Sequence, residues 1–478
     1  MKKNYTWKEI CTKFEKSIIL LLEFVMYVAA LATFFLLFAI DNPEIVTLSR
    51  TAAITLSTYV IILFLLTCIY GKYDVGIRKS KQIIFSLVLA GVITDLFTYF
   101  QLIIMKTNDA NNRTFKIENL GILCAVILVQ LVIYILMTYA GNAFYFWIKE
   151  AETCLIITSD VEDAERVAGA LKEFRKRYRV TEIVDYQRAD LEQKMLEVST
   201  VFLYDVPVDT RTKIVDFCYQ NLKNIYFNPH IADILERNSK QVIIDDMSFF
   251  SSQFHTITYE QRIIKRLMDI FISAIALIIT SPILLISAIC IKKNDGGSVM
   301  FRQKRATVNG KVFLIYKFRT MKENVGNYSV TDDDDRVTSV GKFLRKYRID
   351  ELPQFYNILK GDMSLVGPRP EMLENVEDYT KEMPEFRYRL RMKAGLTGNA
   401  QIIGKYNTSS RDKLMLDLMY IENYSILKDI QLLFQTILVL FNAEDSTAAF
   451  SEAQEKKADS QKKAAEDQKQ VETENEAE

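Results

Sequence analysis

The sequence predicts a membrane protein in three parts: a four-helix transmembrane bundle, an α/β domain, and a mainly α domain with a re-entrant membrane helix. Three observations support this fold class. Apolar stretches near the N-terminus are each about as long as a helix needs to cross a bilayer, roughly 20 residues. The next region alternates short apolar runs with helical patterns. A further apolar stretch contains a proline and has basic residues at both ends.

The composition sets limits on function. The chain has 478 residues, of which 49% are hydrophobic, and their clustering indicates membrane segments rather than one large core. The formal net charge is zero, so no overall field attracts nucleic acid, and no nucleic-acid partner is expected. The six cysteines are scattered and there are only two histidines, which disfavours a disulfide framework, a histidine metal site and a Ser-His catalytic pair.

The first domain is predicted to cover residues 1–148. Its four spans are predicted at 17–40, 51–70, 83–105 and 120–140. Lysine and arginine are concentrated before the first span and between the second and third, so both ends of this multi-pass domain are expected to face the cytosol. Glu23 and Asp95 lie within spans, where an ionisable side chain can mark a polar function. The basic and then apolar N-terminus lacks a small-residue cleavage site and is expected to remain as an anchor.

The second domain, residues 149–255, is predicted to be a Rossmann-like α/β domain. Strands are predicted at 154–158, 180–184, 200–204, 225–227 and 242–244, and helices at 160–172 and 209–219. Such alternation is typical of a parallel sheet. The turn after the first strand, 158–163, has no glycine for close approach to a phosphate, and its carboxylates would repel one. A regulatory or structural role is therefore favoured over nucleotide binding.

The apolar stretch 267–291 is interrupted by Ser281 and Pro282. Proline removes a backbone donor and clashes with the preceding helical turn. Basic residues flank the stretch on both sides, so a full crossing would place one basic cluster outside the cell. A re-entrant helix broken at Ser281-Pro282 satisfies both observations. The alternative is an ordinary fifth span with a tolerated proline.

The third domain, residues 260–442, contains an adjacent pair of carboxylates, Asp350 and Glu351. Pro353 suits the first turn of a helix, so Asp350 is expected at or just before a helix N-terminus. A carboxylate held there is expected to stay ionised and can act as a nucleophile. The second carboxylate can hold a divalent metal or move a proton. Taken alone, such a pair is more often an ordinary solvated helix start.

Basic residues in the same domain have the geometry to contact phosphate. The Gly-Pro-Arg-Pro turn at 367–370 would hold Arg369 in a fixed position, suited to bidentate binding. Lys317 and Arg319 alternate with Phe318 in a strand-like run and so point to one face. The alternatives are a structural turn with a surface arginine and an ordinary solvated face.

The series as a whole resembles the polyprenyl-phosphate hexose-1-phosphate transferases, bacterial sugar transferases that begin exopolysaccharide, capsule or glycan assembly. The resemblance covers residues 262–442. Its most specific part runs from Leu344-Arg345 through Asp350-Glu351-Leu352-Pro353-Gln354 to Gly367-Pro368-Arg369-Pro370. The preceding spans and α/β domain are similar to the long branch of the family, whose members usually take UDP-glucose or UDP-galactose.

The resemblance implies a reaction. Asp350 would attack the β-phosphate of a UDP-sugar, release UMP and form a phosphosugar-enzyme, which undecaprenyl phosphate would then attack. Asp350 and Glu351 would be the catalytic pair and would also bind Mg²⁺, which offsets phosphate charge. The reaction would be the first membrane step of exopolysaccharide or capsule synthesis.

The resemblance also implies a binding site and a location. Phosphate or nucleotide contacts are expected from Lys317, Arg319, Arg345 and Arg369. Ser281 and Pro282 match the break in the family's re-entrant helix. That match places the active site among membrane lipids at the cytoplasmic face of the bacterial inner membrane. The sequence is compatible with either a monomer or a homodimer.

The sequence departs from the family pattern at several positions. The family usually has glycine at Thr307, proline at Ala394, tryptophan at Asn399 and an Arg-Asn pair near Lys405 and Tyr406, so sugar specificity and loop shape stay open. The acidic run 332–335 is expected to be a solvated loop, with metal binding as the alternative. Residues 411–441 are expected to pack on the third domain or to lie along the membrane surface. Residues 443–478 are expected to be a disordered tail.

The alternative functional classes are a membrane sensor or scaffold without chemistry, and a transporter. The intact Asp350-Glu351 and Arg369 motifs argue against a sensor, because a non-catalytic relative should have lost at least one of them. Four spans with few intramembrane charges argue against a transporter.

Overall fold

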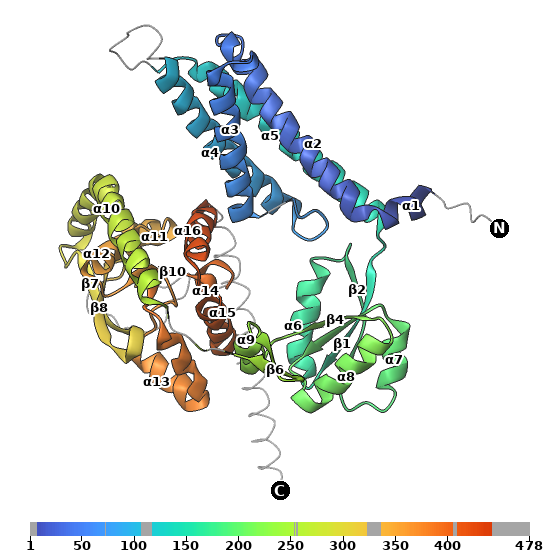
Figure 1. The fold of residues 1–478 in the computed structure, drawn as a ribbon. Coiled ribbons are helices and arrows are strands. Elements are labelled where there is room, and N and C mark those ends of the chain that lie inside the picture. Colours follow the sequence, from blue (N-terminus) through green and yellow to red (C-terminus); the bar gives the residue numbers. More distant parts are fainter. Residues whose placement is uncertain are drawn as a thin grey trace, which may run out of the picture. The chain divides into compact units, whose positions relative to one another are not determined.

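The computed structural model describes residues 7–71, 73–106, 117–252, 254, 257–322, 336–404 and 409–441 (Figure 1). The chain divides into two compact units, Met1–Asn228 and Pro229–Glu478. The predicted acidic loop 332–335, the pair Lys405 and Tyr406, and the predicted tail 443–478 lie outside the described residues.

The first unit begins with four long helices at the predicted spans. They are α2 (Glu15–Phe38), α3 (Arg50–Tyr70), α4 (Ser80–Lys106) and α5 (Leu120–Ile148), preceded by the short α1 (Trp7–Lys13), with the 3-10 turn η1 (Pro43–Val46) between α2 and α3. Each long helix is apolar and long enough to cross a membrane. At most half of each apolar stretch is buried within the structure, which leaves much apolar surface for lipid to cover.

Polar side chains join these four helices in their interior. The Gln130 amide on α5 donates to Asp95 Oδ1 at 3.1 Å, to the Tyr59 hydroxyl at 3.2 Å and to the Ala30 carbonyl at 3.2 Å. Asp95 and Tyr59 are fully buried. Hydrogen bonds between helices in hydrocarbon support their association, so helix packing accounts for a carboxyl group at position 95.

The α/β region of the same unit contains a four-stranded parallel sheet with strand order β2-β1-β3-β4. The strands are β1 (Glu152–Thr158), β2 (Tyr178–Asp185), β3 (Thr200–Tyr204) and β4 (Asn224–Phe227). The helices α6 (Val161–Lys172), α7 (Leu191–Glu197) and α8 (Val208–Gln220) connect them. Two buried apolar clusters, one around Leu155 and one around Ile156, lie on opposite sides of β1, as alternate residues of a strand do.

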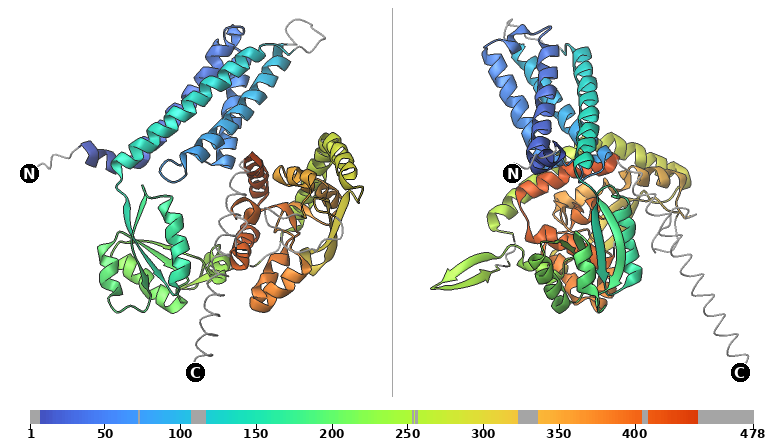
Figure 2. Two further views of the ribbon diagram at one scale, coloured as in Figure 1. Left: turned by 180° about the vertical axis from the view of Figure 1, so that it is seen from behind. Right: turned by 90° about the vertical axis from the view of Figure 1, so that its right-hand side faces the viewer.

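The fifth predicted strand does not extend this sheet. After α9 (Ile231–Glu236), β5 (Lys240–Ile244) pairs antiparallel with β6 (Met247–Ser251). Asp245 and Asp246 form the two-residue turn, and Asp245 has a φ of 60°. A tight hairpin turn requires positive φ, which aspartate tolerates, so the chain reverses here instead of crossing to a parallel neighbour. Figure 2 shows this hairpin extending away from the helices of the second unit.

The long helix α10 (Tyr259–Asp295) stays helical across Ser281 and Pro282 and is bent (Figure 1). Pro282 has no N–H to donate to the carbonyl of Ile278, four residues earlier. The Ser281 hydroxyl donates to that carbonyl at 2.7 Å, so the group that proline leaves free is satisfied. The predicted break is thus a bend within one helix rather than a gap between two.

We expect Ser281→Ala to destabilise the protein by about 1 kcal/mol, because the Ile278 carbonyl would lose its partner in an apolar setting. Thermal unfolding of the purified protein in lipid nanodiscs measures the change. Thr280→Val is the matched control. The Thr280 hydroxyl donates to the Ala276 carbonyl, which keeps its regular helical hydrogen bond when that hydroxyl is removed. Equal melting temperatures for the Ser281→Ala and Thr280→Val variants would contradict this account.

The polarity of α10 is the reverse of that of a surface helix on a soluble domain. Lys265, Asp269 and Ser273 are buried, whereas Phe271 and Ile278 are 68% and 73% exposed. Both ends of α10 contact other elements of the second unit. Lys265 donates to the Val366 carbonyl at 2.9 Å, and Ile291 packs with Phe318 and Leu344. The helix is therefore suited to lipid along its middle and to protein at both ends.

The rest of the second unit is mainly helical, as predicted. Its helices are α11 (Ser339–Lys346), α12 (Gln354–Lys360), α13 (Leu373–Glu382), α14 (Asn399–Ile402), α15 (Ser410–Glu422) and α16 (Ile426–Phe441), with 3-10 turns η2 (Val308–Gly310), η3 (Ile349–Glu351) and η4 (Pro384–Arg391). An antiparallel pair, β7 (Met300–Ala306) and β8 (Val312–Phe318), and a parallel pair, β9 (Ser364–Val366) and β10 (Gly395–Thr397), complete it. Leu414, Leu418 and Leu432 are fully buried, so α15 and α16 pack on the core of this unit.

Candidate active site

Asp350 and Glu351 lie in η3, between α11 and α12. Arg348, with a φ of 53°, turns the chain out of α11 and into η3. Pro353 stands immediately before α12, as expected for a proline at a helix start. Both carboxylates are therefore held on a short, tightly wound connection rather than on a loose loop.

Most of the predicted cations surround this pair. Lys317, on β8, donates to Glu351 Oε1 at 3.0 Å, and Arg369 Nη2 lies 3.7 Å from the same oxygen. Arg345 donates to the Thr320 hydroxyl at 2.8 Å, and its charge acts on Asp350. Residues from β8, α11, η3 and the turn after β9 thus converge on one site.

Arg319, the remaining predicted cation, lies just beyond β8 and is buried, with 8% of its surface exposed. Its backbone N–H donates to the Val299 carbonyl at 2.9 Å. It is the immediate neighbour of Thr320, to which Arg345 is bonded.

The two carboxyl groups differ in their ionisation. Burial and the negative charge of Glu351 raise the pKa of Asp350, and Lys317 and Arg345 only partly offset this. Burial also opposes ionisation of Glu351, but Lys317, Arg369 and Arg348 hold its pKa below its usual range. Of the two carboxylates, Glu351 is the one that makes the direct contacts with Lys317 and Arg369.

The turn 367–370 is rigid for a reason visible in its backbone. Gly367 donates to the Thr397 carbonyl at 2.9 Å, and Gly395 donates to the Pro368 carbonyl at 2.9 Å. A Cβ on Gly367 would lie 2.3 Å from the Lys393 carbonyl oxygen, and one on Gly395 would lie 2.0 Å from the Gly367 nitrogen. Only glycine lets the segment after β9 lie this close to β10. The close contact fixes the backbone position from which the Arg369 side chain extends.

Two arginines that were not predicted hold the same turn, the buried Arg389 and the half-buried Arg305. Arg389 donates to the Arg369 carbonyl at 2.8 Å, and Arg305 donates to the Pro370 carbonyl at 3.2 Å. Burial lowers the pKa of Arg305 to about 10. Arg305 lies within residues 262–442, the range of the family resemblance, but no role was predicted for it. Nothing in the local sequence distinguishes Arg389 from the neighbouring surface arginines.

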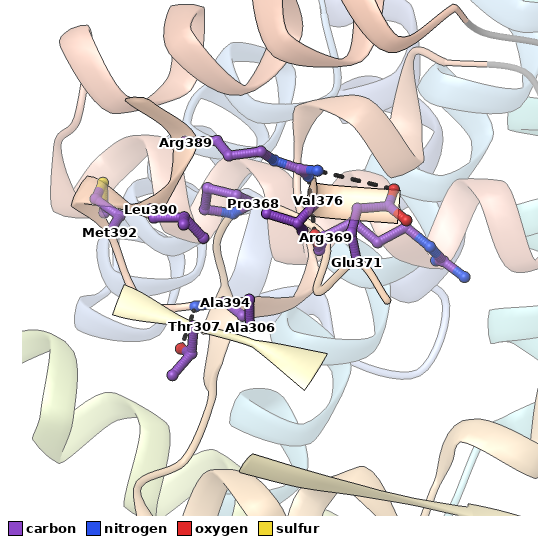
Figure 3. Close-up of a pocket in the computed structure, with 10 residues that line it drawn as sticks. All are labelled: Ala306, Thr307, Pro368, Arg369, Glu371, Val376, Arg389, Leu390, Met392 and Ala394. Carbon is purple, nitrogen blue, oxygen red and sulfur yellow. Dashed lines mark hydrogen bonds and ion pairs between the residues drawn. The ribbon is translucent and has the colours of Figure 1, made fainter. Parts of the chain in front are cut away.

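A pocket lies beside this turn (Figure 3). Its charged lining is Arg369, Glu371 and Arg389, and its other walls include Val376, Leu390 and Met392. Two residues that depart from the expected family pattern, Thr307 and Ala394, are in contact here. The Ala394 N–H donates to the Thr307 hydroxyl oxygen at 3.1 Å. A proline at 394 would lack that donor, so the two departures are structurally coupled.

The site offers few ligands for a metal. Within the described residues, no group of three or more His, Cys, Asp or Glu side chains is placed to hold an ion. The adjacent carboxylates of Asp350 and Glu351 fit Mg²⁺, which commonly uses one or two protein carboxylates and takes its other ligands from substrate phosphates and water.

Comparison with known proteins agrees with the family resemblance found in the sequence. A family model described as bacterial sugar transferase matches residues 260–443. The chain is 45% identical over 180 residues to a UDP-N-acetylgalactosamine-undecaprenyl-phosphate N-acetylgalactosaminephosphotransferase of Aeromonas hydrophila. It is 36% identical over 190 residues to a UDP-glucose:undecaprenyl-phosphate glucose-1-phosphate transferase of Caulobacter vibrioides, and 40% identical over 178 residues to an uncharacterized sugar transferase, EpsL, of Bacillus subtilis.

These matches differ in how much of each relative they cover. They involve 36–38% of this chain. The chain spans less than half of the Aeromonas protein, 43%, but 71% of the Caulobacter protein and 86% of the Bacillus protein. The family model locates its match in residues 260–443, which include Asp350, Glu351 and Arg369.

Proposed function

Because this chain belongs to the bacterial sugar transferase family, we propose that it transfers a hexose-1-phosphate from a UDP-sugar to undecaprenyl phosphate. The observation that carries the proposal is the half-buried Asp350-Glu351 pair set among Lys317, Arg345 and Arg369. Carboxylates that face several cations suit a reaction in which a phosphoryl group is both bound and attacked.

The proposed chemistry has two steps. An Asp350 oxygen attacks the β-phosphorus of the donor, the bond from that phosphorus to the bridging oxygen breaks, and UMP leaves with the bond's electron pair. An oxygen of undecaprenyl phosphate then attacks the same phosphorus and displaces the Asp350 carboxylate. Arg369 and Lys317 would stabilise negative charge on the phosphoryl oxygens, and Glu351 keeps both cations next to the nucleophile.

Asp350 and Glu351 would hold Mg²⁺, which when bound neutralises phosphate charge. Asp350 must be deprotonated to attack, and the Lys317 and Arg345 charges favour that form. Asp350 is the better candidate nucleophile, because Glu351 is already engaged by Lys317 and Arg369.

We further propose that α10 enters and leaves the bilayer from the cytoplasmic side of the inner membrane. Both of its ends contact the same compact unit, while the apolar side chains between them are exposed. A complete crossing would separate those ends by the thickness of the hydrocarbon, about 30 Å. Re-entry places the carboxylate pair near the headgroups, where a soluble nucleotide sugar and a lipid phosphate can both reach it.

The test of this function is an assay of the purified protein with undecaprenyl phosphate, Mg²⁺ and a panel of UDP-sugars. UDP-glucose and UDP-galactose are the favoured donors, and UDP-N-acetylgalactosamine belongs in the panel because the Aeromonas relative is named for it. We expect UMP release and a lipid-linked sugar phosphate with at least one donor. Absence of UMP with every donor, from protein that is folded and in lipid, would reject the proposal.

The raised pKa of Asp350 predicts a pH dependence. Because the ionised carboxylate attacks, kcat/KM should fall as the pH drops through that pKa. Lys317 lowers the pKa of both carboxyl groups, so Lys317→Met should shift the acid limb of the pH profile to higher pH. Lys360→Met, which removes an exposed lysine paired with Asp362, should leave the limb in place. A shift to lower pH in the Lys317→Met variant would rule out this electrostatic account.

A further inference from the structure

Arg389 joins the turn that carries Arg369 to the helical part of the second unit. It lies on η4, is 2% exposed, and forms an ion pair with Asp417 of α15, with Nη2 2.6 Å from Oδ2. The same Nη2 donates to the Arg369 carbonyl at 2.8 Å. One buried side chain therefore fixes the backbone from which Arg369 extends (Figure 3).

Arg389 is itself held from other directions. Its guanidinium carbon lies 4.8 Å from the ring centroid of the buried Phe386, which is cation–π geometry. Its Nη1 lies 3.8 Å from Glu371 Oε1, and that oxygen is also 3.6 Å from Lys413 Nζ. With partners on η4, on α15 and in the turn, the guanidinium has little freedom to move.

Stability alone is a weak reason for a buried ion pair here. Replacing such a pair with apolar residues of similar volume often leaves stability unchanged or higher. What an apolar pair cannot do is donate a hydrogen bond to the Arg369 carbonyl. The Arg369 side chain is 43% exposed and reaches to within 3.7 Å of Glu351, so its position depends strongly on where its backbone is held.

We propose that Arg389 is a positioning residue for sugar-phosphate transfer. Paired with Asp417, it holds the Arg369 backbone so that the Arg369 guanidinium meets the diphosphate of the donor. This inference rests on the proposed function and deepens it. Arg389 is buried and acts through Arg369 rather than on the donor. Displacing a group that contacts substrate by about 1 Å can cost on the order of 10²-fold in rate.

A double-mutant cycle tests the coupling of the two arginines. Arg389→Met is expected to raise KM for the UDP-sugar and to lower kcat/KM by about 10–100-fold. Arg369→Met should cost at least as much, and adding Arg389→Met to it should cost little more, because the two act on one contact. Equal fold losses from Arg389→Met in both backgrounds would overturn the proposal.

Arg391→Met is the matched control. Arg391 lies on the same 3-10 helix, its side chain is 41% exposed, and it pairs with Glu422 at 3.7 Å. Losing a partly exposed pair that does not contact the Arg369 turn should have little effect on catalysis, so its kcat/KM should stay within about twofold of the wild-type value. A loss as large as that of Arg389→Met would mean that η4 is generally sensitive to substitution, and would count against a specific role for Arg389.

A second variant separates positioning from folding. Arg389→Met alone leaves Asp417 buried without its cation, which is destabilising. Combining it with Asp417→Leu removes both charges, and this double variant should melt close to the wild-type temperature yet keep the raised KM. A well-folded double variant with wild-type KM and kcat would refute the positioning role. A wild-type protein without activity in the same assay would instead reject the proposed function.

Discussion

Asp350→Asn is expected to abolish transfer, lowering kcat by at least about 10³-fold, because the amide cannot take the place of the carboxylate nucleophile. The direct measurement is the intact mass of the protein after incubation with a UDP-sugar and Mg²⁺ in the absence of lipid acceptor. Wild-type protein should gain the mass of one hexose phosphate, and the Asp350→Asn protein should gain none. UMP release from this variant at the wild-type rate would show that another group is the nucleophile.

The loss of activity in the Asp350→Asn variant should not result from unfolding of the protein. Because burial and Glu351 raise the pKa of Asp350, ionisation of this group works against the folded state. A neutral asparagine of the same shape should therefore leave the melting temperature unchanged or raise it. Asp378→Asn, on α13, removes an exposed carboxylate paired with Lys381 and should keep wild-type activity. Reduced stability of the Asp350→Asn protein would contradict the view that ionised Asp350 works against the folded state.

The largest effect on stability is expected from Lys265→Met. Lys265 of α10 donates to the Val366 carbonyl and to the carboxylate of Asp429, which is fully buried and also accepts from Tyr420. Removing the ammonium leaves Asp429 as an uncompensated buried charge, a change that typically costs about 3–5 kcal/mol. Chemical unfolding of the purified protein, followed by circular dichroism, measures the loss.

Two comparisons make this prediction specific. Lys265→Met combined with Asp429→Leu removes both charges and should recover most of the lost stability. Lys360→Met breaks an exposed lysine pair with Asp362 and should cost at most about 1 kcal/mol. If Lys265→Met were no more destabilising than Lys360→Met, the buried Lys265–Asp429 pair would not anchor α10 to α16.

The sequence predicted the elements that depend on local patterns. The four spans, the strands β1 to β4 and the long apolar helix appear where length and periodicity placed them. The strand at 242–244 was also correctly located, but its partner was not. Pairing depended on a two-residue aspartate turn, and an apolar run gives no information on which strand it will join. In α10 the Ser281 hydroxyl satisfies the carbonyl that Pro282 leaves free, so the predicted break is a bend within one helix.

The candidate site was predicted in part for a similar reason. Asp350, Glu351 and Arg369 lie in motifs with proline or glycine at fixed offsets, so the sequence marks them. Arg389 and Asp417 are 28 positions apart and meet only through the tertiary fold. An arginine in a run of alternating basic residues gives no sign of whether it will be buried. Charged residues that act from inside a domain are therefore the ones that single-sequence reasoning misses.

The arrangement of α10 has a consequence for how this protein is built. The helix α10 turns polar side chains toward its own domain and apolar side chains outward, so the domain itself contains a segment suited to membrane binding. We expect that such a domain can bind a bilayer without the preceding spans. The Bacillus relative, 86% of whose length is matched by 37% of this chain, fits such independence. If α10 re-enters the bilayer as proposed, we expect the second unit to remain bound to a membrane after the N-terminal unit is deleted.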